Sequence, residues 1–100
     1  MNLKPIDAKK WERCYHFTHP GEFLKDELKV RGIKQKDFAS HIGTQKTNLN
    51  EILKGKRDIN AELAVLLELS LGVSSLFWMH AQVNYDIAIA KNKLIEKQKS

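Results

Sequence analysis

Side chains that can contact DNA bases or phosphates are concentrated in one short part of this 100-residue chain. Amide, hydroxyl and amine groups occur at Gln45, Lys46, Thr47, Asn48 and Asn50. These groups bind base edges and phosphate oxygens in the major groove of DNA, whereas a solvated helix more often carries pairs of Glu and Lys. The segment is therefore a candidate nucleic-acid-binding surface, and the alternative is a polar surface without that role.

Positive charge gathers around the same segment. The formal net charge is +5, and most of the excess falls between residues 34 and 57. The basic residues there are Lys34, Lys36, Lys46, Lys54, Lys56 and Arg57, and the acidic ones are Asp37 and Glu51. A local basic patch favours a polyanionic partner, although a solvated lysine-rich surface has the same composition. Lys54, Lys56 and Arg57 are natural phosphate contacts, or else plain solubilising residues.

The elements that must position these side chains are predicted to be helices. Apolar residues recur at spacings of three and four. The helices are expected from His19–Pro20 to Gly32, from about Gln35 to Gly43, from about Gln45 to Leu53, from Asn60 to Leu71, and from Ser74 or Ser75 towards Lys91. No alternation of β-branched residues predicts a strand. The fold class is therefore all-α, with five helices and short connections.

The second and third of these helices have the pattern of a helix-turn-helix. Two short helices joined by a tight glycine-containing turn must cross at a steep angle, and Gly43 can adopt the positive φ that this turn needs. Ala39 is the small residue at the crossing. The pattern resembles the bacterial and phage repressors of the Cro/C1, or XRE, class, which implies a lambda-repressor-like domain. Thr44 departs from it, because an aliphatic residue is commoner there. Gln35 opens the second helix, where such repressors often bind a phosphate or a base edge.

The fourth and fifth helices are apolar on more than one face, which requires burial on more than one face. A 100-residue domain has room for only one modest core, so a second copy of the chain is expected to cover part of this surface, mainly on the fifth helix. The candidate interface residues are Leu66, Trp78, Val83, Tyr85 and Ile87. A two-fold dimer would also place two recognition helices about 34 Å apart, as successive half-sites of an operator require. The alternative is that these side chains complete the core of a monomer.

The flanking residues carry a closer resemblance. The entry His19-Pro20-Gly21-Glu22, the loop Gly55-Lys56-Arg57 and the exit Phe77-Trp78, Gln82, Asn84-Tyr85-Asp86 are similar to those of HigA-type antitoxins over residues 19–90. The resemblance implies a homodimer that represses its own operator and neutralises a HigB/RelE-like toxin, which cleaves messenger RNA. A stand-alone phage or plasmid repressor is the first alternative. A protein-interaction module that has lost DNA binding is the second.

Other classes of function find little support in the sequence. Cys14, His16 and His19 are potential zinc ligands, but their spacing matches no common structural site, so no metal or cofactor is expected. The chain has no zinc-protease motif, phosphate-binding loop or nucleophile elbow, and an enzyme is not expected. No apolar run approaches the ~20 residues of a membrane span. The single cysteine fits a reducing cytoplasm. The expected organisation is an arm over residues 1–18, a helix-turn-helix domain with its dimerisation helix over 19–91, and a polar tail over 92–100.

Overall fold

The computed structural model of the chain describes residues 3–8 and 17–99. Its helices are α1 (Pro20–Val30), α2 (Gln35–Ile42), α3 (Lys46–Leu53), α4 (Ala61–Leu71) and α5 (Ser75–Lys99), and no strand occurs in the described residues. The predicted all-α class with five helices and a helix-turn-helix is confirmed. Among the described residues, none of the helices combines the length and the apolar composition of a membrane span.

Local chemistry sets where the helices begin and end. The Nδ1 atom of His19 accepts a hydrogen bond from the Gly21 N–H at 2.9 Å, and the Asn60 side chain accepts one from the Leu63 N–H, also at 2.9 Å. Each bond satisfies a backbone donor that has no partner inside its helix. Gly43 ends α2 with a φ of 76°, a conformation that other residues adopt only with strain. The turn between α2 and α3 therefore depends on this glycine.

One hydrophobic core joins α1–α4 to the first turns of α5. Leu24, Leu49, Leu67 and Trp78 are each 0% exposed and come from four different helices. Burial of each such side chain stabilises the fold by about 1.5–3 kcal/mol. Ala39 is buried at the predicted crossing, while Thr44 is half-buried in the turn that follows. The helix-turn-helix thus belongs to the core and is not a separate appendage.

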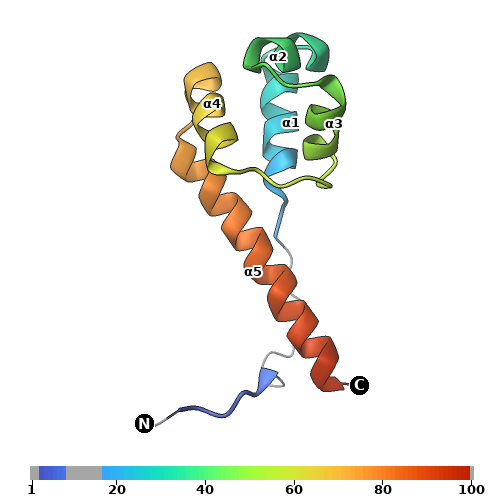
Figure 1. Cartoon of the computed structure of the whole chain (residues 1–100), viewed down its shortest axis with the longest axis vertical. Helices are drawn as coiled ribbons and strands as arrows, with labels where there is room; N and C mark the ends of the chain where they lie inside the picture. The colour runs from blue at the N-terminus through green and yellow to red at the C-terminus, as the bar shows by residue number, and fades with distance from the viewer. Residues whose placement is uncertain (1–2, 9–16, 100) are drawn as a thin grey trace.

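Helix α5 continues well beyond the rest of the domain, and the beginning of the chain lies beside its far end (Figure 1). There the Gln98 side chain accepts a hydrogen bond from the Ala8 N–H at 2.6 Å and donates one to the Ile6 carbonyl at 3.3 Å. Ala88 and Ile95 are only 3% and 4% exposed. The expectation that the helix would end near Lys91 and give way to a frayed polar tail is wrong, because contacts with the start of the chain support the last turns.

Candidate nucleic-acid interface

The recognition helix α3 buries one side and presents polar groups on the other. Leu49, Ile52 and Leu53 lie in the core. Lys46 and Thr47 are exposed and Asn50 is half-buried on the opposite side. Residues three and four apart share a helix face, so these three polar side chains form one outward surface. This surface presents an amine, a hydroxyl and an amide to a partner.

The N-terminus of α3 is open to an anion. Its N-cap residue Gln45 has extended backbone and makes no side-chain capping bond, and the first turn contains no acidic residue. The first N–H groups of a helix lack partners within it, and the helix dipole adds positive potential at this end. Together with the Lys46 amine, this terminus is suited to a phosphate group.

Two further predicted contact residues, Gln35 and Asn48, are half-buried. Gln35 is half-buried at the first position of α2, whose N-cap Lys34 also makes no side-chain capping bond. Asn48 is half-buried and lines a hollow of about 280 Å³ together with Thr44 and Leu63. The hollow lies between the helix-turn-helix and α4, so the structure does not bring Asn48 together with Lys46, Thr47 and Asn50. Thr44 also lines this partly open and polar hollow, so burial of its hydroxyl costs little folding free energy.

The basic loop after α3 is tied to α3 itself. Lys54 and Lys56 are exposed. The Nε and Nη2 atoms of Arg57 both donate to one oxygen of Glu51, at 3.1 and 2.9 Å. Sequence reasoning counted Glu51 only as an opposing charge, yet it orients the guanidinium next to the recognition helix. Arg57 keeps donors free for a phosphate because the guanidinium has five N–H groups.

The same loop lies against buried polar side chains at the N-cap of α1 and on α5. His19 is 6% exposed, its ring lies edge-on to Tyr85 at 4.8 Å, and its Nε2 atom is 3.9 Å from Asp58. Because Nδ1 accepts the Gly21 bond, the proton of the neutral ring is assigned to Nε2, a buried atom that has no hydrogen-bond partner among the described residues. On α5, buried Gln82 hydrogen-bonds to Asp58 and Ile59. Sequence reasoning recorded Gln82 only as a feature of a resemblance, and His19 as part of the same resemblance, as a helix start and as a discounted zinc ligand.

The predicted dimer residues occupy different surroundings. Val83 and Ile87 are exposed, and Leu66 and Tyr85 are half-buried. Trp78 is 0% exposed. The expectation that Trp78 lies at an interface is wrong, because the protomer's own core encloses its side chain. Cys14 and His16 of the discounted zinc set lie outside the described residues, and no metal-binding group of three or more His, Cys, Asp or Glu occurs within them.

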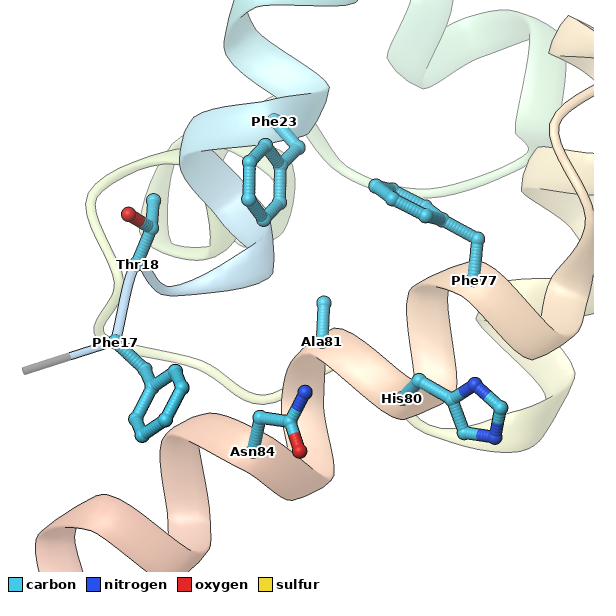
Figure 2. Close-up of a pocket in the computed structure, with 7 residues that line it drawn as sticks. All are labelled: Phe17, Thr18, Phe23, Phe77, His80, Ala81 and Asn84. Carbon is cyan, nitrogen blue, oxygen red and sulfur yellow. The ribbon is translucent and has the colours of Figure 1, made fainter.

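A hollow of about 410 Å³ lies between α1 and α5, away from the recognition helix. Figure 2 shows Phe23 and Phe77 facing each other across it, with Ala81 between them and Phe17 near Asn84. The rings of Phe23 and Phe77 pack edge to face with centroids 5.5 Å apart. None of its lining residues belongs to α2 or α3, so this hollow, which has both aromatic and polar lining residues, is separate from the basic surface.

The helix-turn-helix family pattern matches residues 24–78, which spans α2, α3 and the core around them. The chain belongs to this family. It is 32% identical over 74 residues to virulence-associated protein I of Dichelobacter nodosus, a match covering 73% of this chain and 68% of the relative.

Solved structures of the family extend the likeness to the whole fold. An addiction module antidote protein of the HigA family from Coxiella burnetii has a TM-score of 0.76 at 31% identity, over 85% of this chain and 94% of that one. The Pseudomonas aeruginosa antitoxin HigA, solved with the higBA promoter, has a TM-score of 0.71 at 33% identity, over 75% and 83%. This XRE-type protein is thus a DNA-binding, non-enzymatic helix-turn-helix protein that resembles HigA antitoxins.

Proposed function

We propose that the protein is the antitoxin of a type II toxin–antitoxin system. In this proposal a homodimer binds the operator of its own operon and represses it, and the same protein neutralises a HigB/RelE-like toxin that cleaves messenger RNA. It would act in the cytoplasm, on the nucleoid when bound to the operator. The observation that carries the DNA-binding part is the outward surface of α3, with Lys46, Thr47 and Asn50 beside an uncapped helix N-terminus.

The proposed DNA contacts follow from the arrangement of the site. Lys46 and the α3 N-terminus would bind phosphates and fix the register of the protein on the duplex. Thr47 and Asn50 would face the base edges, where an amide can pair bidentately with adenine. The remaining proposed contacts are Gln35, Gln45, Lys54, Lys56 and Arg57. Asn48 is placed at the margin, because it lines the hollow towards α4.

The proposed dimer is built on the exposed side of α5. Leu76, Val83, Ile87 and Leu94 are 40–65% exposed there. With His80 and Ala90 between them, these side chains alternate at spacings of four and three residues, which is the repeat of a seam between two paired helices. A two-fold interface places the same patch of both subunits together, so a second copy of this chain is the occupant that fits the seam. Leu66 on α4 remains a candidate at its edge, whereas Tyr85 lies on the other side of α5, where its ring packs edge-on to His19.

The proposed toxin partner is supported by the relatives. The Coxiella burnetii and Pseudomonas aeruginosa structures are described as an antidote protein and an antitoxin. The likeness covers nearly the whole of the first of these chains. A repressor that acts without a toxin has the same DNA-binding surface and remains the alternative.

The first experiment is light scattering coupled to size exclusion, on the protein alone and with the DNA upstream of its own gene. We expect a dimer that forms a defined dimer–DNA complex and dissociates from it at high salt, because released counterions drive binding to phosphates. A protein that is monomeric and does not bind this DNA would overturn the repressor proposal. Co-expression with the neighbouring gene then tests the toxin proposal. A stable complex with the product of that gene, together with rescued growth, supports an antitoxin. A gene product that is not toxic and does not bind this protein favours the stand-alone repressor.

A further inference from the structure

Gln82 is a buried amide on the inner side of α5, with 3% of its surface exposed. Its Nε2 group donates to an oxygen of Asp58 at 3.1 Å and to one of Asp86 at 2.9 Å, and its Oε1 accepts from the Ile59 N–H at 2.8 Å. Both amide hydrogens are therefore paired. Such a group holds its neighbours in one arrangement, because breaking a bond leaves a buried polar atom without a partner.

Two of these three partners belong to the loop between α3 and α4. Asp58 and Ile59 directly follow Lys56 and Arg57, and the Ile59 side chain is anchored in the core. At the other end of the loop, the Gly55 and Lys56 N–H groups donate to the carbonyls of Ile52 and Glu51 at 3.0 and 2.8 Å. A Cβ added to Gly55 would be in ordinary contact with the His19 ring, 3.5 Å from Cγ. Lys56 and Arg57 thus lie between two parts of the loop that are held in place, Gly55 on one side and Asp58 with Ile59 on the other.

We propose that Gln82 is a positioning residue for DNA binding, which holds the loop so that Lys56 and Arg57 face the phosphate backbone. Gln82 itself does not contact DNA in this proposal. A loop held in place before binding loses less conformational entropy when its side chains contact a partner. The inference rests on the proposed operator binding and assigns to one side chain of α5 part of the affinity of the DNA-binding surface.

The first test is Gln82→Glu, which nearly preserves the shape of the side chain. The carboxylate loses both donors and faces the carboxylates of Asp58 and Asp86. We expect operator affinity to fall at least tenfold, because the contacts of Lys56 and Arg57 with phosphate are weakened in both protomers of the dimer. The slope of log affinity against log salt should also fall, by about one for each lost phosphate contact. Asn84→Asp is the matched control, since it adds the same charge at an exposed position of the same helix.

A double-mutant cycle separates positioning from a general loss of stability. In a background with Lys56→Ala and Arg57→Ala, Gln82→Glu should cause no further loss, because the contacts it positions are already gone. In a Lys46→Ala background the full loss should remain. Equal losses in both backgrounds, or a variant with the wild-type salt slope, would overturn the inference. Adding Asp58→Asn to Gln82→Glu should restore binding, since the new amide can donate to the new carboxylate.

A charge-matched pair keeps the inference testable if Gln82→Glu does not fold. The Asp58 side chain is 73% exposed, so its replacement leaves the core intact. Asp58→Asn and Asp58→Ala remove the same negative charge, but only the asparagine retains an acceptor for Gln82. We expect the alanine variant to bind the operator more weakly than the asparagine variant, and equal affinities would refute the proposal. A wild-type protein that does not bind the operator at all would instead refute the proposed function.

Discussion

At the scale of single residues, Lys46 carries the clearest electrostatic prediction. It is exposed at the first position of α3, beside the uncapped helix N-terminus. Lys46→Ala should weaken operator binding and lower the salt slope by about one per protomer, or about two for the dimer, because each protomer loses one phosphate contact and its released counterion. The measurement is affinity by fluorescence anisotropy over a series of salt concentrations. Lys93→Ala, which removes an exposed lysine near the end of α5, is the control and should leave the slope unchanged. An unchanged slope for Lys46→Ala would remove this residue from the interface.

Asn50 carries the prediction for sequence reading. Its amide lies on the same side of α3 as Lys46, one turn further along. Asn50→Ala should reduce discrimination at particular base pairs by about 1–3 kcal/mol, the value of one good bidentate contact. The test is competition binding with a set of operators that each carry one changed base pair. A loss of the same size on every operator would show that Asn50 supports binding without reading a base.

At the scale of elements, α1 and α3 approach so closely that only glycine fits between them. A Cβ atom added to Gly21 would overlap the carbonyl oxygen of Ile52 and come within 3.0 Å of the His19 Nδ1 atom. Gly21→Ala gains about 1 kcal/mol of helix propensity. Overpacking costs about 1–3 kcal/mol or more, and backbone cannot move aside as a side chain does. We therefore expect a net loss of stability in urea unfolding. Lys25→Ala, on the exposed side of the same helix, should stay within about 0.5 kcal/mol of wild type. A Gly21→Ala protein as stable as wild type would contradict the close approach.

The junction between α4 and α5 carries a pH-dependent prediction. The Ser75 N–H donates to the Glu68 carboxylate at 2.7 Å, and this backbone bond, together with the Ser75 side chain, lowers the pKa of Glu68. The bond therefore stabilises the fold fully above the ordinary glutamate pKa, and the contribution is lost as the pH falls through the lowered native value. Glu68→Gln should melt at a lower temperature than wild type at neutral pH, and the difference should shrink in acid. Glu96→Gln on α5 serves as the control. A difference that does not depend on pH would show that the charge of Glu68 does not matter.

The helices and the face of α3 could be predicted because their causes are local. Proline, glycine and asparagine mark the ends, and the spacing of apolar residues fixes which side of α3 is buried. The last turns of α5 could not be predicted, because Gln98 is bonded to Ile6 and Ala8 at the other end of the chain. The roles of Trp78 and Gln82 could not be predicted either, because they too depend on contacts with segments that are distant in the sequence. An apolar or amide side chain on a helix does not reveal which distant segment covers it.

At the scale of the whole molecule, α5 connects the two surfaces that the proposed function requires. Its inner side buries Trp78 in the core and bonds the loop after the recognition helix through Gln82. Its outer side carries the seam proposed to pair with a second copy. Residues of the two sides are neighbours in the sequence, as Gln82 and Val83 are. The spacing of two recognition helices in a dimer would therefore be set by the helix that also holds each DNA-binding loop.

Breaking the seam should separate dimerisation from folding. Val83→Lys with Ile87→Lys places two charges in the proposed interface, where pairing with a second copy would bury them without partners. Both side chains are exposed in the protomer, so the fold should survive. We expect a monomer by light scattering, with an unchanged helical signal in circular dichroism. Its salt slope on the operator should fall to about half, because one protomer makes half of the phosphate contacts. Val30→Lys, at an 85% exposed position on α1, is the control and should remain dimeric. A double variant that stays dimeric would move the interface away from α5, and the two half-sites would then have to be spaced by another surface.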